Sequence, residues 1–405
     1  TIMKKDVKLL GMAAMFFMTF ASCTNDELRE CYQGEEISFT TRVTRAVEMK
    51  KENLTEFKVY GLGQGSNSFF INGQTAKKGD NNIFNLEQSA FWPTGEPTVK
   101  YWAYAPTDIT ADVSMSAGSQ IFNNFAPGDN IETQKDLVVA YTTVKMEDAA
   151  KAVPLQFHHA LSQVEIKAHC PSIDKQVYIK GAWIVNVNTI GKLQFSTAAA
   201  AMNYIEWTSG TPGKYGISLD ATQLGSKKES ATPLLAGKTN MLLVPQTVKG
   251  YDFEAGSGAY ILLLCRVETH HDGQIENAPE GGSSQSGPIY NDVPKNKHIH
   301  QLFPITKEYN SNAYGYTCVA VDFDWKSGKK YVYNLDFCGH TSGAGVYPPE
   351  NLPEGLPEGD DIIEKPGDKD PGDPVLDNPI RFTVDVDSWS SGHDDGLEEE
   401  EVEVK

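Results

Sequence analysis

The chain has 405 residues, 40% of them hydrophobic, and a formal net charge of −19. This length suffices for two domains of roughly 100–200 residues each. Residues 350–405 contain nineteen acidic and four basic residues, so they carry most of the negative charge. No basic cluster occurs on the rest of the chain, and nucleic acid is therefore not expected as a partner.

The first residues predict an export signal. Three lysines precede an apolar run from Leu9 to Ala21, which at about thirteen residues is too short to span a bilayer. Small residues stand directly before Cys23. We therefore expect a lipoprotein signal peptide over residues 1–22, lipidation of Cys23, and a polar tether over residues 23–34 that holds the chain to outer-membrane lipid. An ordinary secretory signal, with an incidental cysteine, is the alternative.

Short runs of alternating apolar and polar residues, separated by turn residues, recur along the rest of the chain. This pattern predicts an all-β protein of stacked antiparallel sheets with Greek-key connections. We expect two β-sandwich domains, over residues 35–152 and 153–347. Strands are expected at residues 36–43, 56–61, 98–104, 137–142, 163–169, 176–187, 241–244, 260–267, 316–323 and 331–337.

Polar segments are expected to separate or follow these strands. Long loops are predicted at residues 123–133, 210–215 and 269–296. Over residues 348–379 the composition changes to Pro, Gly, Asp and Glu, which predicts a flexible, self-repelling linker. Residues 389–405 form an acidic tail.

One more strand is predicted beyond the linker, over residues 380–388. Its alternation is the cleanest in the chain, and its apolar face consists of Ile380, Phe382, Val384 and Val386. The first expected strand repeats the pattern, with one face formed by Ile37, Phe39, Thr41 and Val43. Because each strand has one face that needs burial, the two could fill similar grooves.

Five cysteines follow Cys23, an odd number that cannot pair completely within one chain. Cys318 and Cys338 flank an expected hairpin turn at residues 325–330, which would place them within disulfide reach. Two buried free thiols are the alternative reading.

The sequence contains little evidence for a catalytic or metal site. His298 and His300 share a face of an extended segment, but no further ligand stands at a familiar spacing, so no metal or other cofactor is expected. No nucleophile elbow or Ser/His/Asp arrangement is recognisable. The sequence is therefore not expected to encode an enzyme.

A family resemblance rests on five short segments in a fixed order. They are residues 37–40 with 44–46, 91–93 with 101–106, 155–164, 242–246 and 325–333. Together with the lipoprotein signal, they resemble the fimbrillin family of Bacteroidales-type bacteria, the type V pilins and related surface lipoproteins. The resemblance implies two transthyretin-like domains at the cell surface.

The resemblance also implies assembly into a fimbrium by strand exchange. A protease would cut after Arg45, before Ala46, or less favourably after Arg42, and release the first strand. The last strand of a neighbouring subunit would then occupy the vacated groove, and both strands are expected at sheet edges. The insertion at 348–379 and the acidic tail depart from a plain pilin. The alternative is therefore a surface lipoprotein that does not polymerise and binds a glycan or host ligand.

Overall fold

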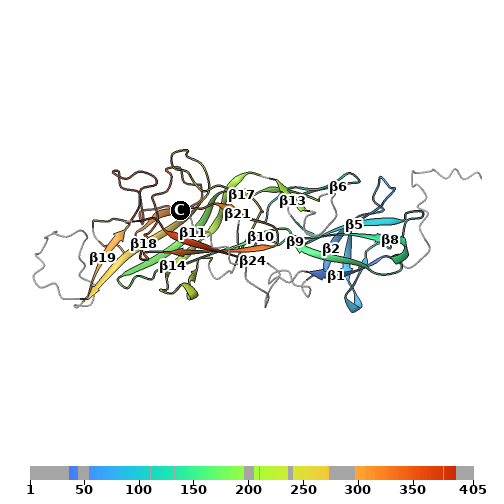
Figure 1. The fold of residues 1–405 in the computed structure, drawn as a ribbon, viewed down its shortest axis with the longest axis horizontal. Helices are drawn as coiled ribbons and strands as arrows, with labels where there is room; N and C mark the ends of the chain where they lie inside the picture. Colours follow the sequence, from blue (N-terminus) through green and yellow to red (C-terminus); the bar gives the residue numbers. More distant parts are fainter. Residues whose placement is uncertain are drawn as a thin grey trace, which may run out of the picture.

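The computed structural model describes most of the chain after the signal region. The described residues are 36–43, 54–109, 111–128, 130–131, 133–195, 205–208, 210–235, 240–272, 297–307, 309–376 and 378–388. This part is built of strands and short 3-10 turns and contains no α-helix, so the predicted all-β fold is confirmed (Figure 1).

The first domain is a closed barrel of seven strands, at the right of Figure 1. Around the barrel the strands are β1 (Ser38–Val43), β4 (Ile83–Leu86), β3 (Ile71–Lys78), β2 (Glu56–Gly63), β5 (Thr98–Ala105), β8 (Val138–Lys145) and β9 (Val153–His159). Alternate residues point inward, and the interior is rich in aromatic rings, including Phe39, Phe57 and Tyr101. The barrel thus has its own core.

The domain boundary differs from the expected one near Val153. Strand β9 pairs with β1 in parallel, from Phe39↔Val153 to Val43↔Phe157, and it also pairs with β8. It therefore belongs to the barrel, and the boundary follows His159. Parallel pairing between the two chain ends of a domain leaves no local turn signal, so the sequence pattern does not show it.

The second domain is a two-sheet sandwich, at the left of Figure 1. The first sheet, here called the β24 sheet, contains β15 (Thr232–Pro233), β10 (Ser162–His169), β22 (Lys329–Asp336), β24 (Arg381–Ser388) and β16 (Met241–Leu243). The second, the β18 sheet, contains β14 (Pro212–Gln223), β11 (Lys175–Asn188), β18 (Tyr260–Asp272), β20 (Tyr314–Ala320), β23 (Ile362–Ile363) and β19 (Lys297–Phe303). Their facing side chains form one large apolar core.

Most strand pairs are antiparallel, as predicted, but β1/β9, β10/β22 and β20/β23 are parallel. A short ribbon of β17 (Thr247–Val248) and β21 (Phe323–Asp324) also belongs to the second domain. The loop expected at residues 210–215 is wrong, because these residues largely belong to β14. Of the loop expected at 269–296, residues 269–272 extend β18, and the remainder lies outside the described residues.

The two halves of the chain also build one sheet together. It has the order β13 (Ile205–Thr208), β12 (Gly191–Phe195), β7 (Ser119–Phe125) and β6 (Asp112–Ser116), with β6 and β7 from the first half. Phe122 of β7 packs on Tyr104 of the barrel at 5.0 Å between ring centroids and on Phe195 of β12 at 5.9 Å. Figure 1 shows this sheet above the junction, so the domains share a core.

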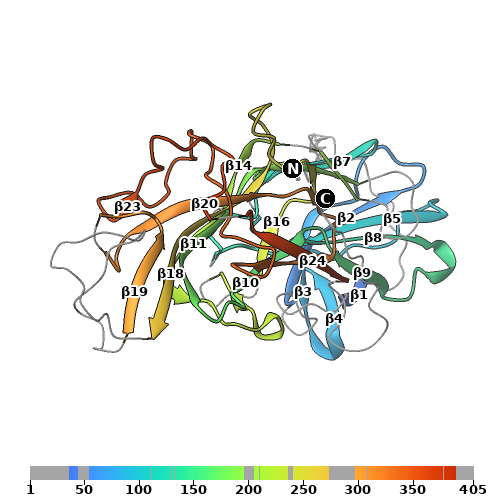
Figure 2. The same cartoon turned by 60° about the vertical axis from the view of Figure 1, so that its left-hand side comes forward.

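The predicted flexible linker over residues 348–379 is wrong in its physical character. This segment folds back over the outer face of the β18 sheet (Figure 2). Backbone N–H groups of Tyr314 and Val375 donate to carbonyls of Asp361 and Gly345, at 2.8 and 3.0 Å. Three scattered apolar side chains, Leu352, Leu356 and Ile362, cover aromatic and aliphatic groups on that face. The composition averaged over the segment does not indicate these contacts, because the apolar residues that make them are few and far apart.

Candidate functional site

Strand β24, the predicted donor, docks within its own chain. It pairs antiparallel with β22 over eight residues, from Lys329↔Ser388 to Asp336↔Arg381, and it is the last strand of its sheet. Asn334 donates from Nδ2 to Asp385 Oδ2 at 2.8 Å, and the Arg381 N–H donates to Ser342 Oγ at 2.8 Å. Among the described residues no strand pairs with the other edge of β24, and such an open edge is the usual template for a further strand.

Burial of the predicted donor face decreases along β24. Ile380 is buried, Phe382 and Val384 are half-buried against the sandwich core, and Val386 is 37% exposed. Its own domain therefore covers this apolar face only in part. The free energy needed to detach an edge strand with a partly covered face is lower than that needed to detach a central strand.

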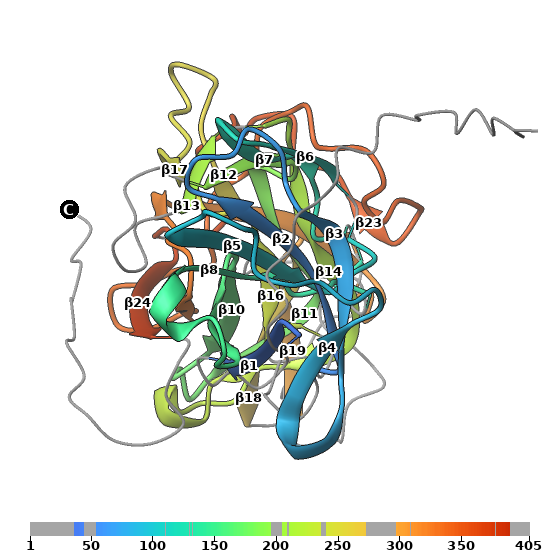
Figure 3. The same cartoon turned by 90° about the vertical axis from the view of Figure 1, so that its right-hand side faces the viewer.

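Strand β1 lies inside a slot rather than at an edge, which corrects the expectation. It pairs antiparallel with β4 on one side and in parallel with β9 on the other (Figure 3 views the molecule from the barrel end). Phe39 is fully buried and makes edge-on contacts with Phe57 and Tyr101, at 5.8 and 5.7 Å between ring centroids. Removal of β1 would open an apolar slot with backbone hydrogen-bonding groups along both walls.

The apolar positions of the two strands match in spacing, whereas Ser38 and Arg42 correspond to Arg381 and Asp385. Ile37, Phe39, Thr40 and Val43 have the same spacing as Ile380, Phe382, Thr383 and Val386. At the position of Thr41, which is buried in the barrel, β24 has Val384. A β24 strand placed in the slot in this register would present the same apolar face, with one hydroxyl replaced by a methyl group, and a carboxylate at the exposed position of Arg42.

The predicted processing residues differ in what the structure shows of them. Cys23, Arg45 and Ala46 lie outside the described residues. Arg42 is exposed but lies within β1, opposite Gln156 of β9. A protease needs its target in an extended, accessible conformation, so Arg42 is a poor site while β1 is paired.

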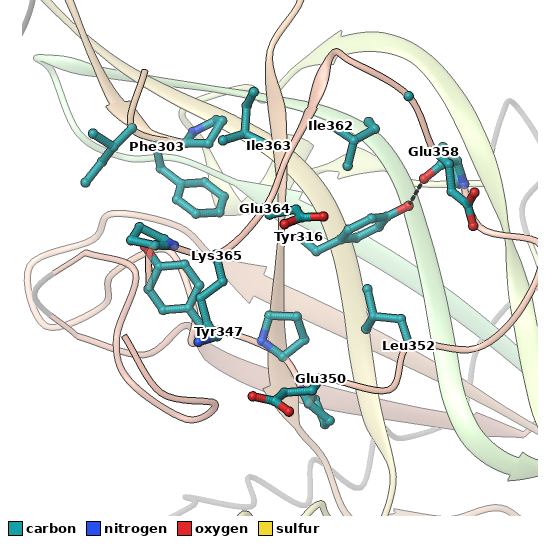
Figure 4. A pocket seen from close by; sticks show the side chains of 17 residues that line it. Phe303, Tyr316, Tyr347, Glu350, Leu352, Glu358, Ile362, Ile363, Glu364 and Lys365 are labelled. Carbon is teal, nitrogen blue, oxygen red and sulfur yellow. Dashed lines mark hydrogen bonds between the residues drawn. The ribbon is translucent and has the colours of Figure 1, made fainter. Parts of the chain in front are cut away.

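A pocket of about 550 Å³ lies where residues 348–366 cover the sandwich (Figure 4). Its apolar wall includes Phe303, Tyr316 and Tyr347, and its rim contains the charged residues Glu350, Glu358, Glu364 and Lys365. Tyr316 donates its hydroxyl to the Pro357 carbonyl at 2.8 Å, and burial raises the pKa of that hydroxyl. The volume and the mixture of apolar wall and polar rim are typical of small-ligand sites.

The sequence did not reveal this pocket, because its cover was expected to be a linker. One local signal was available: the adjacent apolar residues Ile362 and Ile363 interrupt an acidic segment. In the structure they form β23 and line the pocket.

The expected disulfide between Cys318 and Cys338 is not formed. Cys318 lies in β20 and Cys338 follows β22, and these strands belong to opposite sheets rather than to one hairpin. Both residues are buried free thiols, the alternative that the sequence left open.

Within the described residues, no three His, Cys, Asp or Glu side chains are grouped so as to hold a metal ion. The same part of the chain has no helix with the length and hydropathy needed to cross a membrane.

One family model and several solved structures are similar to this chain. The model of the family described as Fimbrillin-like matches residues 41–345. A fimbrial protein of Bacteroides vulgatus has the same fold, with 13% identity, a TM-score of 0.53, and coverage of 88% of this chain and 100% of that one.

Two further solved structures are similar at lower scores. Candidate cell adhesion proteins of Bacteroides uniformis and Bacteroides ovatus are each 12% identical, with TM-scores of 0.41 and 0.38. The alignments cover 87% and 76% of this chain, and 99% and 93% of those chains. No curated protein matches the sequence. Because the family model spans well over half of its length, the chain belongs to the fimbrillin-like family.

Proposed function

We propose that this protein is a lipid-anchored subunit or accessory component of a cell-surface fimbrium. In this proposal Cys23 holds the precursor to the outer membrane, and cleavage after Arg45 releases β1. The β24 strand of a neighbouring subunit then enters the slot between β4 and β9. The observation that carries the proposal is the match in spacing between a fully enclosed β1 and a partly covered β24.

The exchange is favourable on hydrogen-bond and burial grounds. At its sheet edge β24 has one hydrogen-bonded neighbour, whereas the slot offers two. Each additional backbone hydrogen bond contributes a net ~0.5–1.5 kcal/mol. Complete burial of Phe382 and Val384, at the positions of buried Phe39 and Thr41, adds a share of the ~1.5–3 kcal/mol typical of each fully buried side chain. These gains oppose the loss of the β22 pairing and the cost of ordering the donor strand.

A covalent lock on β24 tests the exchange. Lys330 and Asp387 are directly opposite each other on β22 and β24, and directly opposite residues of antiparallel strands lie within disulfide reach. The double variant Lys330→Cys/Asp387→Cys should, when oxidised, stay monomeric after an arginine-specific protease has produced a chain that begins at Ala46. Reduction should restore detergent-resistant ladders on gels.

The matched control is Lys330→Ser/Asp387→Ser, which should assemble under both conditions. If the locked chain forms ladders as readily as the control, β24 is not the donor. If the cleaved control stays monomeric, the chain does not assemble by itself.

A second candidate function is ligand binding by a surface protein that does not polymerise. The pocket of about 550 Å³ and the docking of β24 in its own chain favour this alternative. The ligand would be a glycan or another small host-derived group. A glycan array with saturable binding that is lost in Glu364→Ala, together with failure of the cleaved chain to form ladders, would select this function.

A further inference from the structure

Two cysteines come together at the ends of two parallel strands of the β24 sheet. The register of β10 and β22 ends with His169↔Asp336, and the Phe337 N–H continues the ladder by donating to the His169 carbonyl at 2.9 Å. Cys170 follows β10 directly, whereas Cys338 lies one residue beyond Phe337, at a positive φ of 52° that ends the extended run. Since neighbouring strands are about 4.8 Å apart and the offset is a single residue, the two cysteines lie within reach of a disulfide.

The two thiols are in contact at the margin of the core. Cys170 and Cys338 are 4% and 7% exposed and belong to the same apolar core, and the Cys170 thiol donates to the Lys175 carbonyl at 3.5 Å. The interaction with Cys338 lowers the pKa of the Cys170 thiol, and the interaction with Cys170 together with burial raises the pKa of Cys338. The pair therefore consists of one thiol that ionises more easily and one that stays protonated beside it.

The other two described cysteines differ from this pair. Cys265 and Cys318 are fully buried, and burial raises the pKa of both thiols. A thiol of this kind is a poor nucleophile at neutral pH, because the reactive species is the thiolate.

We propose that Cys170 and Cys338 form an intrachain disulfide that joins the ends of β10 and β22. The oxidant is a disulfide, either a small one such as oxidised glutathione or the disulfide of an oxidoreductase. Such oxidants act on exported chains, and export is predicted from the first residues of this one. The inference does not depend on strand exchange.

The reaction is a two-step thiol–disulfide exchange. The Cys170 thiolate attacks one sulfur of the oxidant, which breaks the S–S bond and releases one thiol after protonation. Cys338 loses its proton and attacks the Cys170 sulfur of the mixed disulfide, releasing the second thiol. The cysteine pair is oxidised by two electrons, and the oxidant is reduced to two thiols.

The cross-link would anchor the strand to which β24 is attached. The Cys338 N–H donates to the Gly343 carbonyl at 2.8 Å, and the Gly343 N–H donates to the Pro379 carbonyl at 2.9 Å, directly before β24. A bond at Cys338 therefore fixes β22 and this turn to β10. It also closes a loop that contains most of the second domain, which constrains the unfolded chain.

Peptide mapping of the full chain tests the proposal. The reduced protein is exposed to oxidised glutathione and quenched in acid, its free thiols are alkylated under denaturing conditions, and the digest is analysed by mass spectrometry. The expected product is a linked peptide pair containing Cys170 and Cys338, lighter by two hydrogens than the reduced peptides, with Cys265 and Cys318 alkylated. Alkylation of both Cys170 and Cys338, or a link from either to another cysteine, overturns the proposal.

Variants supply a second measurement. The oxidised wild-type chain should have a higher thermal midpoint than the reduced chain, and this difference should disappear in Cys170→Ala and in Cys338→Ala. Cys318→Ala is the matched control, since it removes a buried thiol from the opposite sheet and should keep both the linked peptide and the redox difference. An equal redox difference in Cys170→Ala contradicts the proposal, and the peptide map on the wild-type chain stands even if one variant does not fold.

Discussion

Phe39 anchors β1 in the interior of the barrel. It is fully buried against Phe57 and Tyr101, in the middle of the barrel interior. We expect Phe39→Ala to lower the free energy of unfolding by about 3–5 kcal/mol, because it removes buried surface and leaves a cavity. Urea unfolding monitored by fluorescence measures this. Thr40→Ala, exposed on the same strand, should change stability by less than about 0.5 kcal/mol.

Asp336 should give the protein a specific pH dependence. Burial raises the pKa of this carboxyl above its usual 3.8, although His169 and Arg381 partly oppose the shift. The folded state therefore holds the proton more tightly than the unfolded state, so stability decreases as the pH rises from 3.8 through the pKa of the folded protein.

The variant Asp336→Asn removes this titration. Relative to wild type, it should gain stability as the pH rises through that interval and keep the gain at neutral pH. Urea unfolding of both proteins at a series of pH values measures the difference. A difference that is constant with pH would show that the Asp336 carboxyl does not titrate differently on folding.

Alternation predicted individual site residues well where one face of a strand is buried and the other is not. The faces of Ile380, Phe382 and Val384 and of Ile37 and Phe39 lie as the pattern indicates. The neighbours of those faces were not predictable, because strand pairing is set by contacts between distant residues. The Cys318–Cys338 interpretation failed for this reason, since nothing local shows that the strands bearing them enter opposite sheets.

Strands with clear alternation were found from the sequence, and weaker ones were missed. The start of strand β14 has the composition of a loop, because Pro212, Gly213 and Gly216 lie near it. There it pairs with β11, and the register shifts between Val185 and Val187. Turn-forming residues in a bulged edge strand are thus indistinguishable from a loop by composition.

Proteolysis can test whether residues 348–379 are folded onto the sandwich. Lys369 lies in a hydrogen-bonded turn of this segment: its carbonyl accepts from Lys365 Nζ, and its N–H donates to the Pro366 carbonyl at 3.1 Å. We expect trypsin to leave the Lys369–Asp370 bond intact in the native chain, since cleavage requires local unfolding. Mass spectrometry of timed digests measures this. The same protein in urea should be cut after Lys369, and rapid native cleavage there would restore the linker interpretation.

The two domains are held together by a hydrogen-bonded bridge as well as by their shared sheet. Gln134, before β8, accepts from the Leu242 N–H at 2.7 Å and donates to the Leu242 carbonyl at 3.0 Å. The sequence pattern places these residues in different domains. It cannot show the bridge, because an amide side chain fits many surroundings.

We expect Gln134→Ala to destabilise the whole molecule by about 1–3 kcal/mol, since both backbone groups of Leu242 lose their partner. Differential scanning calorimetry should show a lower midpoint and a separation into two transitions. Lys135→Ala removes only an exposed ion pair with Asp108 and should cost at most about 1 kcal/mol. A single, unshifted transition in Gln134→Ala would show that the bridge does not couple the domains.

The sheet built by both halves has a mechanical consequence. Two domains connected by a single chain crossing can rotate relative to each other under tension. Here a strand pair from each half joins the other edge to edge through β7 and β12. The paired residues are Ile121↔Gln194, Phe122↔Leu193 and Phe125↔Gly191. Any bending at the junction must first rupture these bonds. A pulling force applied to one domain is therefore transmitted to the other through this shared sheet, and the two domains do not separate as independent units would.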